Sequence, residues 1–289
     1  MSSQEVTKYC AVEIPAENKR SIKFLYNTIP GRVLLRLTIL TPISKLVGFI
    51  LRSPASRGMI KNFITENNIN MDEYRPVKYK SFDDFFIREI VDGYRPFPKD
   101  ENALASPCDS KLTVYPITPD SVFTIKNAQY SVETLLRDKA LADEFSGGMC
   151  LVFRLSPDDY HRYCFIDDGE ILDQKFIKGV LHTVRPIAYQ NRPVFCENSR
   201  EYTVIQTKNF GKIIQMEVGA LFVGKISNHK KSNIIKRAEE KGMFQFGGST
   251  VVLLFKKDMI VVDDEITSNT AENLETVVKM GIKVGTKKV

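Results

Sequence analysis

The feature that most constrains this sequence is a series of short β-type runs that begins near Ser106 and continues to about residue 264. Each run is rich in β-branched, aromatic or aliphatic residues, and Gly, Pro, Asn or Asp stands between one run and the next. Runs of this length between turn residues are typical of antiparallel strands. They span residues 111–117, 121–127, 149–155, 162–167, 170–177, 201–208, 212–226, 249–255 and 259–264.

The first third of the chain has a helical pattern instead. Helices are predicted within 30–52, at about 55–67 and at 81–90, where Ser81 is an N-cap candidate followed by two aspartates that suit the positive end of a helix. One further helix is predicted at 131–145, and the basic tail 279–289 is expected at the surface. The sequence therefore predicts an α+β fold, with a helical N-terminal region, 1–100, packed on a mainly antiparallel β domain, 101–289.

Residues 30–52 form the most apolar stretch, and four basic residues are interspersed in it. Pro42 divides this stretch into two short amphipathic helices. Either both helices pack on the core, or they lie at a membrane interface with their basic residues near lipid phosphates. The stretch lacks the roughly 18 uninterrupted apolar residues of a spanning helix.

Composition excludes several classes of function. The 289 residues carry a net charge of +6, which is too small to indicate nucleic-acid binding but suits an anionic membrane surface if the charges cluster. The five cysteines show neither a disulfide framework nor metal-ligand spacing, so we expect reduced thiols in a cytosolic compartment and no metal. No secretory signal and no nucleotide-binding glycine motif is recognisable.

The three histidines are the candidate bases. His161 lies in SPDDYHRYCFIDDG among acids, a tyrosine and an arginine, and such neighbours could orient and tune a base. His182 is flanked by apolar residues and is expected to be a core histidine, whereas His229 is expected in a solvated basic loop.

Two further segments have both a structural and a chemical interpretation. Asp109, in SPCDSKL, sits where a local turn hydrogen bond is common. In FGGST, the Gly248–Ser249 bond is either a simple turn before a strand or a site where the Ser hydroxyl reaches the preceding carbonyl, helped by strain in a permissive turn.

Taken in order, these segments resemble the phosphatidylserine decarboxylase proenzyme family, in its bacterial branch. The resemblance covers the chain from about residue 25 to its end. It rests on the segments SFDDFFIREI, RPF, SPCDSKL, LSPDDYHRYCFIDDG, LHTVRPIAY, FCENSREYT, VGALFVGKI and EKGMFQFGGSTVVLLF.

The resemblance implies a pyruvoyl-dependent carboxy-lyase that cleaves itself before Ser249, giving a β chain, 1–248, and an α chain, 249–289. It also implies that Ser249 becomes the pyruvoyl group and forms a Schiff base with phosphatidylserine, which is converted to phosphatidylethanolamine and CO₂. A processing triad of Asp109, a histidine and Ser249 is implied as well, with Asp109 orienting the histidine.

Many members of the family read Tyr-His-Arg-x-His and use the second histidine as the processing base, but here Cys164 occupies that position. A thiol is a poor general base at neutral pH unless it is strongly perturbed. Either His161 serves both roles or His182 supplies the imidazole from a neighbouring strand, and His161 is favoured.

The implied partners are phosphatidylserine in the membrane, the α and β chains of one proenzyme, and a second copy as a candidate homodimer, with no nucleic acid. The implied location is the cytoplasmic side of the cell membrane, as a peripheral protein, and a lipid substrate favours the interfacial interpretation of 30–52. Two alternatives remain, which are an uncleaved Ser-His-Asp hydrolase using Ser249 and an inactive membrane-associated β domain.

Overall fold

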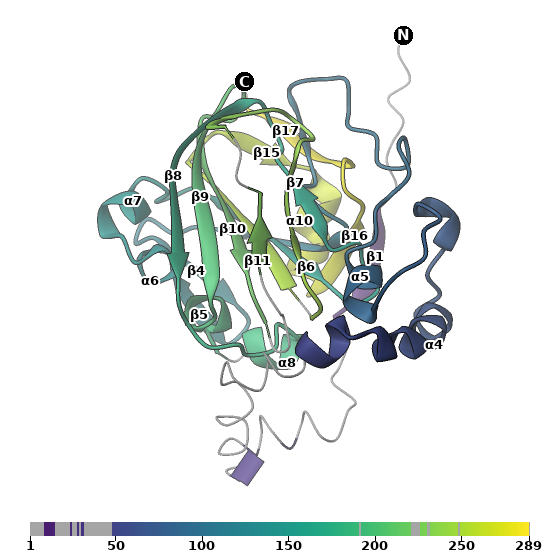
Figure 1. Ribbon diagram of the computed structural model, residues 1–289. Helices are drawn as coiled ribbons and strands as arrows, with labels where there is room; N and C mark the ends of the chain where they lie inside the picture. The colour runs from purple at the N-terminus through teal and green to yellow at the C-terminus, as the bar shows by residue number, and fades with distance from the viewer. Residues whose placement is uncertain are drawn as a thin grey trace.

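A computed structural model describes residues 9–14, 24, 28, 30–31, 48–190, 192–220, 226–229, 232–247 and 249–288. It confirms the α+β fold, in which antiparallel sheets form the body and short helices lie around them (Figure 1). The largest sheet has nine strands, each antiparallel to its neighbours. Their order across the sheet is β1 (Cys10–Glu13), β16 (Leu274–Val278), β3 (Ser110–Pro116), β6 (Met149–Leu155), β14 (Ser249–Phe255), β10 (Lys212–Val218), β9 (Arg200–Thr207), β8 (Gly169–Ile177) and β12 (Ile234–Ile235).

The middle of this sheet is covered on both faces. All seven residues of β14 are buried, which explains why its sequence, STVVLLF, is a continuous apolar run and does not alternate with polar residues. β14 pairs with β6 on one side and with β10 on the other. Residues near the carboxyl end of the chain therefore form the centre of the fold.

Smaller sheets complete the strand framework. One of them, with the order β11 (Ile226–Asn228), β13 (Glu240–Phe244) and β7 (Arg162–Cys164), packs on the large sheet, where Gln215 of β10 donates from Nε2 to the Cys164 carbonyl at 3.2 Å. β4 (Val122–Ile125) and β5 (Ala128–Ser131) form a hairpin. The third small sheet has the order β15 (Ile260–Val262), β17 (Lys283–Lys287) and β2 (Ala103–Ala105).

The expectation that the basic tail lies at the surface is only partly correct. β17 is paired on both sides, and Val284 within it is fully buried. Val284 and Gly285 are buried, whereas Lys283 and Lys287 are partly exposed, so only part of the tail lies at the surface.

The single helix predicted at 131–145 is two helices, α6 (Val132–Leu136) and α7 (Lys139–Asp143). Arg137 ends α6 in a left-handed conformation with φ of 51°, and the Asp138 side chain then caps α7 by accepting from the Leu141 backbone. The remaining helices after this pair are α8 (Pro186–Tyr189), α9 (Val194–Glu197) and α10 (Asp264–Ala271).

The N-terminal helices form a second, smaller core. They are η1 (Pro54–Arg57), α4 (Gly58–Glu66), η2 (Met71–Glu73) and α5 (Phe82–Phe86). The predicted cap at Ser81 is confirmed, because its side chain accepts from the Asp84 backbone at 3.2 Å. The core contains Leu51, Phe82, Phe85 and Phe86, with Phe63 and Phe246 packed against it.

Most of the apolar stretch 30–52 cannot be compared with its prediction, because residues 32–47 lie outside the described residues. Among those that are described, no helix has the length and apolar character needed to cross a bilayer. β1 belongs to the first hundred residues of the chain but pairs with β16 in the large sheet. The division of the chain into two regions at residue 100 stays a prediction.

Candidate active site

Ser249 is the first residue of β14 and lies at one end of the large sheet. It stands opposite Leu155 of β6, and its neighbour Thr250 stands opposite Val218 of β10. The Ser249 side chain is fully buried, and its Oγ has no hydrogen-bond partner among the described residues. Gly248, the other half of the predicted cleavage site, lies outside those residues.

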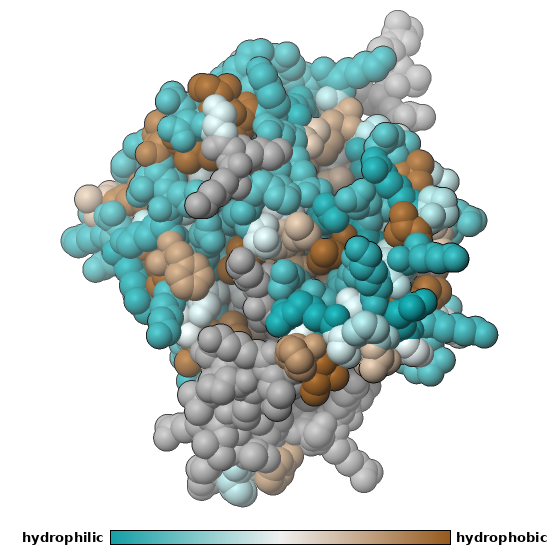
Figure 2. Space-filling model, viewed as in Figure 1, coloured by the Kyte–Doolittle hydropathy of each residue, from teal (hydrophilic) through white to brown (hydrophobic). Residues whose placement is uncertain are grey.

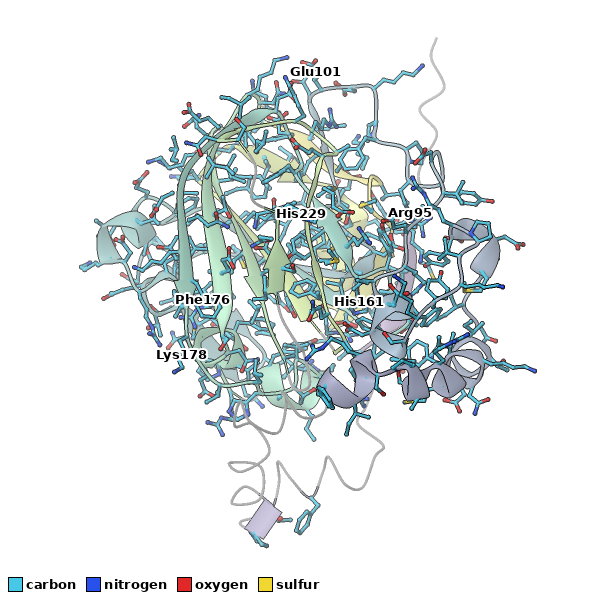
Figure 3. The ribbon with its side chains drawn as sticks, in the orientation of Figure 1. Arg95, Glu101, His161, Phe176, Lys178 and His229 are labelled. Carbon is cyan, nitrogen blue, oxygen red and sulfur yellow. The ribbon has the colours of Figure 1, made fainter. Side chains whose placement is uncertain are left out.

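The chain leaves β6 at Leu155 and returns within six residues to place His161 in the same region. Asp159 fixes this loop, since its carboxylate accepts from the Ser156 backbone at 2.7 Å and from Lys111 Nζ at 2.6 Å. The His161 ring is fully buried and lies against Phe86, with ring centres 4.0 Å apart. Phe86 in turn contacts Phe246, so His161 is close to the segment that leads into Ser249. Figure 3 shows His161 beside the α5 region.

The hydrogen bonding of His161 defines which ring nitrogen is basic. Nδ1 lies 2.9 Å from the Asp159 carbonyl oxygen, which can only accept, so Nδ1 carries the proton and Nε2 has the lone pair. Nε2 has no hydrogen-bond partner of normal geometry among the described residues. Burial, aided by the positive charges of Arg88 and Lys111, lowers the pKa of His161 to about 3. The imidazole is therefore a neutral acceptor at pH 7.

The structure gives Asp109 different partners from those that the triad implies. Arg95 donates to both carboxylate oxygens, from Nε at 2.9 Å and Nη2 at 2.8 Å, and Lys279 Nζ lies 3.1 Å away. The Met280 backbone also donates to Asp109, at 2.8 Å, whereas no histidine is among the contacts of Asp109 in the described part of the chain. Burial opposes ionisation of Asp109, but Arg95 and Lys279 outweigh it and lower the pKa of this carboxyl.

The second candidate base, His182, is buried near the same end of the sheet. Its Nε2 lies 3.2 Å from a carboxylate oxygen of Glu197. Asn198 joins the His182 backbone to the Gly219 carbonyl, and Gly219 directly follows Val218, the register partner of Thr250. His182 lies in an irregular segment and not in a strand.

Cys164, which occupies the place of the family's second histidine, is unsuited to accept a proton from serine. The thiol is buried and donates to the Pro107 carbonyl at 3.3 Å. Burial raises the pKa of the Cys164 thiol, which therefore stays protonated at neutral pH.

Several charged groups near the site were not among the sequence candidates. Arg88 is almost fully buried and donates to the Asp158 carbonyl at 3.0 Å. Arg95 clamps Asp109, and Lys241 forms a buried pair with Glu217 at 2.5 Å. The sequence did point to Arg88 and Arg95, because they lie in the motifs SFDDFFIREI and RPF. No local pattern in the sequence pairs Lys241 with Glu217.

A buried serine and a neutral imidazole in one region of the fold are groups from which enzymes build an activated serine. The sequence model of the family described as phosphatidylserine decarboxylase matches residues 82–286. The chain is 51% identical over 265 residues to "Phosphatidylserine decarboxylase proenzyme 2" of Clostridium acetobutylicum, covering 91% of each chain. It is 41% identical to the phosphatidylserine decarboxylase proenzyme of Clostridium novyi, covering 92% of each, and 39% identical to that of Fusobacterium nucleatum, covering 93% of this chain and 91% of the relative. The chain belongs to the phosphatidylserine decarboxylase family, a family of carboxy-lyases.

Proposed function

We propose that this chain is a self-processing, pyruvoyl-dependent phosphatidylserine decarboxylase that converts phosphatidylserine to phosphatidylethanolamine and CO₂. The observation that carries the proposal is the buried, unpartnered hydroxyl of Ser249. Phe246, three residues before it, contacts Phe86, and Phe86 contacts the His161 ring. A base that is neutral at pH 7 can accept the serine proton without first losing one of its own.

Processing begins when His161 accepts the proton of Ser249 Oγ and the oxygen attacks the Gly248 carbonyl carbon. The peptide C–N bond breaks and an ester joins Gly248 to Ser249 Oγ. Loss of the Ser249 α-proton and of the Gly248 carboxylate then leaves dehydroalanine at the new chain start. Addition of one water and release of one ammonia converts that residue to pyruvoyl.

The residues present suit a pyruvoyl group at position 249, because the side chain of this residue is buried and close to a potential proton donor or acceptor. The group supplies a carbonyl that accepts the electron pair left when CO₂ departs. His161 is the residue of this chain that we propose for returning a proton to the substrate carbon. His182 is the second candidate for a base, beside the carboxylate of Glu197.

The contacts of Asp109 support a positioning role. Asp109 precedes β3, and its clamp by Arg95 and Lys279 ties the start of this strand both to the N-terminal region and to the segment after β16. β3 pairs with β6, and β6 pairs with β14, so the clamp fixes the end of the sheet where Ser249 lies.

The two products of cleavage are expected to stay together. The fragment 249–289 contains β14, which is hydrogen-bonded between β6 and β10 of the longer chain. Arg154 of β6 also forms a buried ion pair with Glu275 of β16, at 2.5 Å. A homodimer stays a prediction, which sedimentation of the purified chain would test.

We further propose a peripheral location on the cytoplasmic side of the cell membrane. A pocket of about 690 Å³ beside α4 is lined by Arg57, Lys61 and Lys78 together with Ile60 and Ile64, and none of the described residues that line it carries a carboxylate. Basic and apolar side chains together suit a surface of anionic lipids. Figure 2 shows hydrophilic and hydrophobic residues side by side in the region of α4.

The intact mass of the purified chain tests the proposal. We expect two fragments, 1–248 and 249–289, with a carbonyl that reacts with hydrazides on the smaller one, and no cleavage of Ser249→Ala. An active preparation with one uncleaved species would refute pyruvoyl formation. Labelling of an uncleaved chain by serine-directed phosphonates would instead support a hydrolase, and an uncleaved chain without activity would support an inactive β domain.

A further inference from the structure

A set of buried polar groups lies between the large sheet and the small sheet β11-β13-β7. Glu217 of β10 accepts from Lys241 Nζ of β13 at 2.5 Å and from Asn228 Nδ2 of β11 at 3.1 Å. Both Glu217 and Lys241 are almost inaccessible to solvent. Gln215, two residues before Glu217, contacts β7 through the Cys164 carbonyl. The side chains of Gln215 and Glu217 therefore both face the small sheet.

Ser249 faces the same layer as Glu217. Glu217 stands opposite Val251 in the pairing of β10 with β14, and paired residues in an antiparallel ladder point to the same face. Ser249 is two residues before Val251, so alternation along the strand gives it that face as well. Side chains in this diagonal relation have Cα atoms about 7–8 Å apart, a separation that one water molecule can bridge.

Several buried polar atoms in and beside this layer have no hydrogen-bond partner among the described residues. Glu217 uses Oε2 for both of its hydrogen bonds, and its Oε1 is buried with no partner among the described residues. The same holds for Ser249 Oγ, Gln215 Oε1 and His161 Nε2. Buried acceptors without a protein partner are the usual hosts of internal water.

Maturation as proposed above requires one water at residue 249 after the chain has been cut. That water must act inside the protein, because Ser249 and His161 are both fully buried. Glu217 has what this step needs, namely an unoccupied carboxylate oxygen on the face of Ser249 and a cation, Lys241, that holds the other oxygen in place. Gln215 Oε1, the other buried acceptor on this face, is an amide oxygen and only weakly basic.

We propose that Glu217, held by Lys241, binds and activates the water that hydrolyses the dehydroalanine at residue 249. This inference rests on the proposed self-processing function. Dehydroalanine first shifts a proton to become the imine. Glu217 Oε1 then takes a proton from the water as its oxygen bonds to the imine carbon. The carboxyl returns that proton to the nitrogen, which gives the carbinolamine. The remaining proton of the added hydroxyl then passes through Glu217 to the nitrogen, the C–N bond breaks, and ammonia leaves as the ketone forms. One water is consumed and no oxidant or reductant is needed.

The test follows the fate of residue 249 during maturation. The full-length chain is synthesised in a cell-free system, samples are quenched with borohydride over time, and the mass of the 249–289 fragment is measured. Borohydride converts an imine to an N-terminal alanine and a ketone to a lactyl group, and these differ by the mass difference between NH and O. For Glu217→Gln we expect normal cleavage with the alanine form accumulating, since loss of a general base slows its step by about 10²-fold or more.

Two further variants separate chemistry from folding. Glu217→Gln/Lys241→Met removes both charges, so no unpaired ammonium remains buried, and it should show the same accumulation. Glu275→Gln is the matched control, because Glu275, like Glu217, is buried and paired with a cation. Its partner Arg154 stands opposite Thr250 and so faces away from Ser249. In this variant, the ratio of the rate of lactyl formation to the rate of cleavage should equal that of the unmodified chain.

The outcomes are distinct. Cleavage of both Glu217 variants without accumulation of the alanine form would overturn the role of Glu217 in hydrolysis. Failure of both to cleave would overturn it as well, because the residue would then be needed before any dehydroalanine exists. If the unmodified chain itself gave no lactyl fragment, the proposed function would fail instead.

Discussion

Replacing His161 tests whether burial keeps this imidazole neutral. The folded chain lowers the pKa of His161 from 6.5 to about 3, because the ring is fully buried and lies near the positive charges of Arg88 and Lys111. The unfolded chain binds a proton at this residue below pH 6.5, whereas the folded chain does not until about pH 3. The contribution of the neutral His161 to the free energy of unfolding is therefore fully present above pH 6.5 and is lost as the pH falls towards 3.

The magnitude follows from the same values. At about 1.4 kcal/mol for each pH unit, the full loss attributable to His161 is about 5 kcal/mol, of which about 3 kcal/mol has gone by pH 4. The measurement is urea unfolding from pH 7 to pH 4, on Ser249→Ala chains so that cleavage does not interfere. We compare Ser249→Ala with Ser249→Ala/His161→Gln, and carboxylates that titrate in both chains cancel in the difference.

We expect the chain that keeps His161 to lose about 3 kcal/mol more over this range than the His161→Gln chain. The control is His229→Gln in the same background, since His229 is partly exposed beside Glu240 and its removal leaves His161 in place. It should keep the pH dependence of Ser249→Ala. Equal slopes for the chains with and without His161 would refute the argument that burial holds this residue neutral.

Three other predictions follow from the contacts. Arg95→Met should lower the free energy of unfolding by about 3 kcal/mol, because it removes the two charge-assisted hydrogen bonds of Arg95 to the buried Asp109 and leaves this carboxylate only Lys279 and the Met280 backbone. Arg75→Met, which removes only exposed ion pairs, should cost less than about 1 kcal/mol. Urea unfolding measures both, and equal losses would contradict the clamp. Iodoacetamide in native buffer should modify Cys10 alone, since the other four cysteines are buried, and intact mass would reveal a second reactive thiol. His182→Gln should still cleave, within about tenfold of the normal rate, while His161→Gln should not; the reverse pattern on a denaturing gel would make His182 the base.

Local pattern in the sequence was enough for the fold class and for several elements. The run STVVLLF predicted a strand, and its lack of alternation fits its position at the centre of the sheet, covered on both faces. The cap at Ser81 was likewise predictable, because a cap depends on residues only three positions apart. The break between α6 and α7 was missed, because helical spacing continues across Arg137 although its backbone turns left-handed.

Contacts between distant residues were decided only by the tertiary structure. The sequence pointed to Ser249, Asp109 and a histidine as a group, but not to Arg95 and Lys279 as the neighbours of Asp109 or to Glu217 on the same face as Ser249. Strand register sets these neighbours, and a shift of one residue would turn every side chain to the opposite face. The sequence determined the residue types available for chemistry, and the pairing of strands far apart in the chain determined which of them meet.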